Sequence, residues 1–95
     1  MASDKENMLS SANYYAGLVT SAKNECLDIY VQLIPPINEI ERKWQGESGS
    51  QMVQELEDTR EKIRGLYNRL VALETRMKSQ ANNIYNTWPE GEEET

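Results

Sequence analysis

The sequence predicts an all-α fold: an antiparallel two-helix hairpin that pairs with another hairpin into a four-helix bundle. In both halves of the 95-residue chain, apolar residues recur at steps of three and four. This spacing lines one face of an α-helix, because 3.6 residues make one turn. The only dense turn signal, residues 44–50, lies between the two halves. The apolar face of each half is also wider than a two-helix contact needs, which favours packing against a second neighbour.

The first helix is expected over about residues 6–44. Pro35 and Pro36 remove two backbone donors and disfavour helical angles in the residues before them. The apolar stripe nevertheless continues in phase across them, so we expect a kink near residues 34–36 and no change of architecture. Cys26 lies on the stripe and is expected to be a small buried residue, with an intermolecular redox role as the alternative. The stripe residues expected in the core or in a dimer interface are Tyr15, Val19, Ile29, Leu33 and Ile40.

A turn is expected at residues 45–49. Gly46 suits the left-handed backbone position that follows a helix, and Trp44 is expected to cap the hairpin core. Trp44 could also insert into a pocket of a partner. Ser48, with Gln51 three residues later, predicts a capping box at the start of the next helix. A connection this short makes the two helices antiparallel.

The second helix is expected over about residues 50–87, so that residues 1–88 form the hairpin. Residues 89–95 carry four glutamates and predict an acidic, flexible tail. Gly65 could allow another helix to approach closely. The expected core or interface residues of this helix are Leu56, Ile63, Leu66, Leu70, Leu73, Met77 and Ile84. The residues that widen the two faces are Leu9, Leu18, Tyr30, Ile34, Val53, Tyr67 and Val71.

The composition excludes several function classes. The chain has 10 Lys and Arg against 16 Asp and Glu, a net charge of −6, with no His and one Cys. It therefore has no disulfide within one chain, no Cys/His zinc site and no His for acid–base chemistry, so we expect a binding protein without catalysis, metal or cofactor. The acidic balance argues against nucleic acid as a partner. No apolar run long enough for membrane insertion occurs, and the polar start lacks the layout of a Sec signal peptide, which predicts a chain that is cytoplasmic at first.

The length, the central Trp44-Gln45-Gly46 and the amphipathic helices on both sides resemble the hundred-residue WXG family. These are the Trp-x-Gly helical hairpins related to the early secreted antigenic target proteins of type VII secretion. The resemblance covers nearly the whole chain. It implies a homodimer or heterodimer of hairpins that is exported by, or escorts cargo to, a secretion ATPase. The expected location is then cytoplasmic followed by secreted.

The chain departs from this family at the export signal. Family members carry Tyr-x-x-x-Asp/Glu after the second helix, whereas Tyr85 is followed four residues later by Pro89, with Glu90 one position too late. Tyr85, Trp88 and Glu90 could form a degenerate recognition signal. Alternatively, a partner supplies the signal, as for the small WXG-like hairpins that bind the helical targeting region of LXG-type toxins. The hypothesis is a type VII substrate or targeting partner, and the alternative is an intracellular structural adaptor that forms a four-helix bundle.

Overall fold

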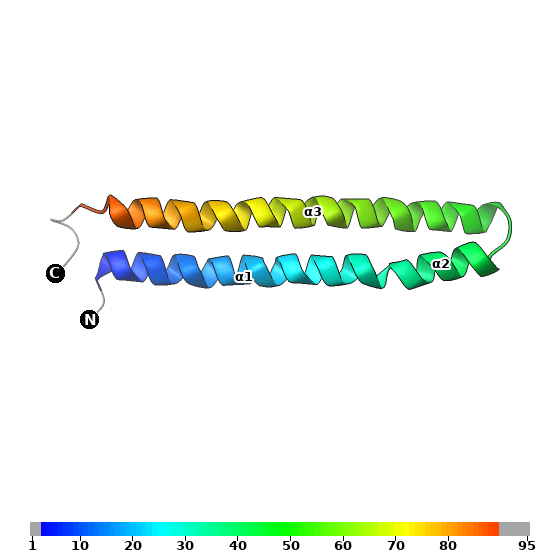
Figure 1. The fold of residues 1–95 in the computed structure, drawn as a ribbon, viewed down its shortest axis with the longest axis horizontal. Coiled ribbons are helices and arrows are strands. Elements are labelled where there is room, and N and C mark those ends of the chain that lie inside the picture. The colour runs from blue at the N-terminus through cyan, green and yellow to red at the C-terminus, as the bar shows by residue number, and fades with distance from the viewer. Residues whose placement is uncertain (1–2, 90–95) are drawn as a thin grey trace. The chain divides into compact units, whose positions relative to one another are not determined.

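The computed structural model describes residues 3–89, and all the regular secondary structure within this range is helical. Helix α1 spans Asp4–Gln32, α2 spans Ile34–Lys43 and α3 spans Glu47–Asn86 (Figure 1). The prediction of an all-α fold is confirmed. Of the predicted acidic tail, residues 90–95 lie outside the described residues. None of the described helices is both long and apolar enough to cross a membrane.

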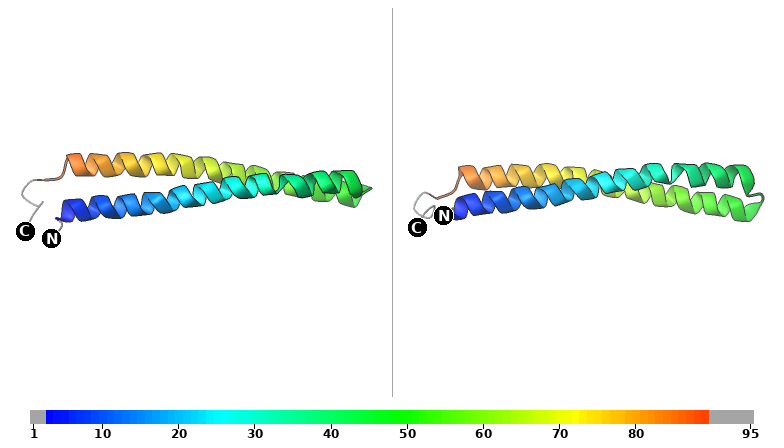
Figure 2. Two further views of the ribbon diagram at one scale, coloured as in Figure 1. Left: turned by 60° about the horizontal axis from the view of Figure 1, so that its bottom comes forward. Right: turned by 90° about the horizontal axis from the view of Figure 1, so that it is seen from below.

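The helices pack as two compact units, and α1 and α3 contribute to both. The first unit combines the chain up to Ala22 with the chain from Leu70 onward, and the second is Lys23–Arg69. In the first unit, Lys5 lies over the ring of Tyr85 and the Thr20 hydroxyl hydrogen-bonds to the Glu74 carboxylate, so the two helical segments are antiparallel. In the second unit, the turn reverses the chain, and α3 returns beside α2 and the end of α1 (Figure 2).

Most of the buried and half-buried residues of each helix follow a heptad repeat, and we call the residues on this repeat the seam rows. Such a repeat is typical of helices that pack with side chains of one helix in the gaps of the other. In α1 and the following residues, the seam rows are Lys5, Leu9, Ala12, Ala16, Val19, Lys23, Cys26, Tyr30, Leu33, Ile37 and Ile40. In α3 they are Gly49, Val53, Leu56, Arg60, Ile63, Tyr67, Leu70, Glu74, Met77 and Ala81.

The seam rows are rotated by one position from the predicted stripe. Up to Leu33, and again from Leu56 to Met77, every second member of the predicted stripe stays in the seam. The alternate members lie just outside it, and their places are taken by neighbours such as Ala16, Tyr30 and Tyr67. The predicted core residues that are exposed in this chain are Tyr15, Ile29, Leu66, Leu73 and Ile84. Those that are buried or half-buried are Val19, Leu33, Ile40, Leu56, Ile63, Leu70 and Met77. The seam of one chain therefore accounts for only part of the apolar face.

The helical arm before the turn is interrupted at Leu33. This residue separates α1 from α2, and Pro35 and Pro36 occupy the first turn of α2, where a missing backbone donor costs least. Leu33 keeps near-helical angles (φ −82°, ψ −11°), and Ile37 N still donates to Leu33 O at 3.3 Å. The seam rows consequently cross the break without a change of phase, from Leu33 to Ile37 and Ile40.

The turn is shorter than predicted. Helix α3 begins at Glu47, so Ser48 lies inside its first turn and is not the capping residue that the sequence suggested. Trp44 ends α2 with extended angles (φ −93°, ψ 114°), and Gly46 has the left-handed φ of +86°. Gly49 is buried, and a Cβ atom there would lie 2.6 Å from Trp44 O. A glycine at this position lets the end of α2 lie directly against the start of α3.

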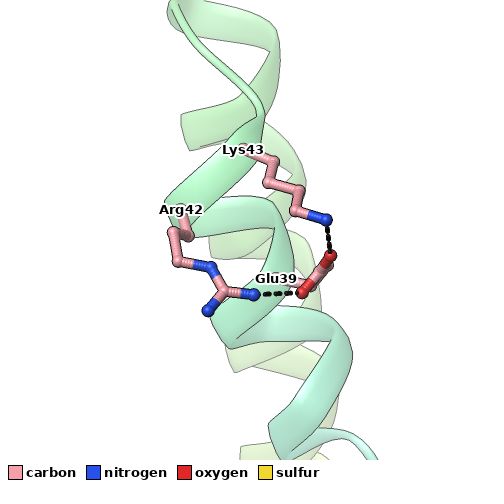
Figure 3. A network of polar contacts seen from close by, with 3 residues as sticks. All are labelled: Glu39, Arg42 and Lys43. Carbon is pink, nitrogen blue, oxygen red and sulfur yellow. Dashed lines mark hydrogen bonds and ion pairs between the residues drawn. The ribbon is translucent and has the colours of Figure 1, made fainter.

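A small ionic cluster covers the last turn of α2. The Glu39 carboxylate is 2.7 Å from both the Arg42 guanidinium and the Lys43 ammonium group (Figure 3). All three side chains are largely exposed, so the cluster contributes little to the stability of the fold. The two cations also lie at the negative end of the α2 dipole, which favours the observed helix end.

Candidate binding surfaces

Each unit buries few apolar side chains. The nearly buried apolar residues are Ala16 and Ala81 in the first unit and Cys26, Ile37 and Ile40 in the second. Among the described residues, no large side chain is fully buried. Since a single pair of helical segments covers so little apolar surface, the exposed apolar side chains beside the seam are the main candidates for function.

In the second unit, Ile29 of α1 and Leu66 of α3 lie beside the seam rows. Ile29 is 45% exposed and Leu66 is 49% exposed. Both residues directly precede a seam residue, Tyr30 and Tyr67. In an antiparallel helix pair, residues in this position of the heptad flank the same side of the contact. We call Ile29 and Leu66 the open pair.

In the first unit, Tyr15 and Leu18 of α1 and Leu73 of α3 are exposed in the same way. Tyr15 and Leu73 each directly precede a seam residue, Ala16 and Glu74, and Tyr15 is 53% exposed. Tyr15 and Leu73 thus occupy the same position of the heptad in the first unit as the open pair does in the second. A helix with apolar residues on three adjacent rows is typical of packing against two neighbours.

The opposite side of the second unit carries a hollow of about 260 Å³. It is lined by Cys26, Leu27, Tyr30, Arg64, Tyr67 and Asn68. Leu27 and Arg64 each directly follow a seam residue, so this hollow and the open pair flank the seam on opposite sides. Cys26 is buried and carries a free thiol, as the sequence predicted for a small core residue.

Arg60 was not singled out by the sequence, because a cation was not expected in the seam. Its Nε donates a hydrogen bond to Tyr30 O at 3.0 Å, and its guanidinium carbon lies 3.9 Å from the centre of the Tyr30 ring. Tyr30 is in the last turn of α1, where carbonyl groups have no partner within the helix. Arg60 thus caps the end of α1 from α3. Knowledge of which heptad positions form the seam would have placed Arg60 in the seam.

The predicted recognition residues near the end of α3 are partly packed. Tyr85 is half-buried, with Lys5 Nζ 4.1 Å from the centre of its ring. Trp88 is also half-buried, and its buried Nε1 makes no hydrogen bond within the described residues. Trp88 and Pro89 line a shallow hollow with Ile84 and Thr87. Glu90 lies outside the described residues, so the three predicted residues are not seen together.

Trp44 does not cap the core in the way that the sequence suggested. Its side chain is 53% exposed, and it borders a hollow with Glu41, Gly49, Ser50 and Val53. The backbone of Trp44, by contrast, packs tightly on the first turn of α3 at Gly49. The indole is therefore available to a partner, while the main chain fixes the turn.

Within residues 3–89, no group of three or more Cys, Asp and Glu side chains is arranged to hold a metal ion. The chain was compared with protein-family models, with curated proteins and with solved structures, and none matched.

Proposed function

We propose that this protein works by binding a helical partner, without catalysis or a cofactor. The observation that supports this function is the row of exposed apolar residues beside the seam in each unit, led by Tyr15 and Leu73 in the first and by the open pair in the second. Moving a side chain of this size from full exposure to full burial is worth about 1.5–3 kcal/mol, and about half of each of these side chains is still exposed. A second helical hairpin is the partner that such rows fit, since it would complete a four-helix bundle.

We further propose that this binding serves type VII secretion, with the chain as a substrate or as the targeting partner of a larger exported protein. The proposal draws on the resemblance to the WXG family. Two observations agree with it: Gly46 adopts the left-handed angle expected of a glycine that follows a helix, and the Trp44 indole is exposed at that turn. Partners of this function would be another WXG-like hairpin or the helical region of an LXG-type toxin, together with the secretion ATPase.

Export of the chain by bacteria that carry such a secretion machine tests this function. The tagged protein is expected in the culture medium without cell lysis, and loss of the ATPase should retain it in the cell. An intracellular adaptor, the alternative, would stay in the cell in both strains. Retention of the chain, alone and with a co-expressed toxin partner, would rule out the secretion role.

Variants of the predicted recognition residues must distinguish loss of an export signal from loss of helix packing. Tyr85→Ala and Trp88→Ala are expected to reduce export strongly. Val31→Ala, which shortens an apolar side chain of α1 that is 52% exposed and lies outside the seam rows, should not. Because Tyr85 and Trp88 are half-buried, the helical content of each variant must be measured by circular dichroism. Unchanged export of both variants would remove these residues from the signal.

A further inference from the structure

The outer face of α3 in the second unit carries a shallow hollow of about 290 Å³ above Gly65. It is lined by Lys62, Gly65, Leu66 and Arg69. These residues have the spacing i, i+3, i+4 and i+7, which is the spacing of the four residues that surround an inserted side chain in knobs-into-holes packing. A Cβ at Gly65 would have no atom within 4 Å, so the floor of the hollow is open. The hollow is shaped to receive one side chain from another helix.

The charges around this hollow indicate what kind of side chain would enter it. Lys62 and Arg69 border it at both ends, and both are exposed and make no ion pair within residues 3–89. A fitting partner therefore presents an apolar side chain with a carboxylate one helical turn away. The same chain holds this combination on α1, where Glu25 is exposed, unpaired within the same range, and precedes the exposed Ile29 by four residues.

The Gly65 hollow and the segment with Glu25 and Ile29 also lie at similar heights along the unit. Arg60 bonds to Tyr30 O, and Cys26 lines a hollow together with Tyr67. In one chain, therefore, residues 26–30 run beside residues 60–67 in the antiparallel sense, which puts Ile29 level with about residues 61–64, at the Lys62 end of the Gly65 hollow. A twofold axis parallel to the helices preserves this height, because it rotates the partner without shifting it along the axis.

We propose that the partner is a second copy of this chain, with Ile29 of each copy seated in the Gly65 hollow of the other. This proposal rests on the proposed function of helix–helix binding and names the partner. In the second unit, α1 of one copy lies beside α3 of its partner, and both turns lie at the same end. Glu25 of one copy then faces Arg69 of the partner subunit. The opposite arrangement, with turns at opposite ends, would place α1 beside α1 and α3 beside α3, where these charges have no opposite partner.

Cross-linking between two single-cysteine variants tests this arrangement. Glu25→Cys and Arg69→Cys, each in a Cys26→Ala background, are treated with a short bismaleimide separately and as a mixture of tagged and untagged protein. We expect the mixed dimer to dominate, because residue 25 of one copy then lies on the helix beside residue 69 of the other, whereas two copies of the same residue lie on helices that are not neighbours. Equal cross-linking of Glu25→Cys with itself would indicate the opposite arrangement and would overturn the proposal.

Sedimentation equilibrium of the full chain measures the association itself. Ile29→Gln and Glu25→Lys should each weaken the dimer by about tenfold or more. The double variant Glu25→Lys/Arg69→Glu should recover much of the loss, and Glu57→Lys, the same charge change on the opposite side of α3, should have little effect. A wild-type chain that stays monomeric at all micromolar concentrations would refute the second copy as partner. Such a chain could still be exported with a different hairpin, so the export test decides the proposed function separately.

Discussion

Replacing Gly49 with alanine tests the tightest contact in the structure. Gly49 lies in the first turn of α3, where alanine would ordinarily stabilise the helix by up to about 1 kcal/mol. The added Cβ, however, would lie 2.6 Å from Trp44 O and 2.9 Å from Trp44 Cβ. These neighbours include the main chain, which cannot move aside as a flexible side chain can. Overpacking of this kind costs about 1–3 kcal/mol, so the net change is expected to destabilise the fold by up to about 2 kcal/mol.

Gly17→Ala provides the matched control. Gly17 lies on an exposed face of α1, and a Cβ there would have no neighbour within 4 Å. This variant should gain the full helix preference of about 1 kcal/mol. The difference in unfolding free energy between the two variants is then about 1–3 kcal/mol, almost all of it due to the contact with Trp44.

Urea unfolding followed by circular dichroism measures this difference. With a slope of about 1 kcal/mol per molar urea, the two midpoints should differ by about 1–3 M. Both variants must be compared at the same protein concentration, because association makes the midpoint depend on it. If Gly49→Ala is stabilised as much as Gly17→Ala, the end of α2 does not lie against the start of α3 as described.

Four further variants, at three places in the chain, test other parts of the fold. Gly46→Ala places a Cβ on a residue with a φ of +86° and should lower the unfolding free energy by about 1–2 kcal/mol. Gly46→Asn should lower it less. Equal stability of the wild-type chain and both variants would contradict the turn geometry. Arg60→Met keeps the apolar part of the side chain but removes the donor to Tyr30 O, and we expect a loss of about 1–2 kcal/mol by urea unfolding. The double variant Pro35→Ala/Pro36→Ala restores two backbone donors and should join α1 to α2. Hydrogen exchange should then be slow at both new amides. Rapid exchange at these amides would show that the break has another cause.

Helix content, the central turn and the continuity of the apolar rows across Pro35 and Pro36 could be predicted from the sequence, because they depend on local spacing. The sequence could not predict which rows of each helix form the seam. Three adjacent rows are apolar in each helix, and the sequence does not say which two face the other helix in the same chain. Burial shows the phase in α1, where Ala16 is buried and its larger neighbour Tyr15 stays exposed.

The candidate binding surface was predicted only in outline. Ile29 and Leu66 were expected among the core or interface residues, and the structure places both outside the seam of one chain. The tight approach at Gly49 and the cap by Arg60 depend on which residues meet across the seam. Neither residue type signals such a role by itself, since glycine and arginine also occur on ordinary helix surfaces.

The hydrogen bond from Arg60 to Tyr30 O also selects one alignment of the two helices. If α3 slid by a full heptad along its neighbour, the apolar rows would still match apolar rows, but the guanidinium would lose both the carbonyl and the aromatic ring of Tyr30. A polar group in such a position sets the register of paired helices at some cost in stability. Arg60 thereby discourages slippage in a repeat whose hydrophobic residues alone would tolerate it.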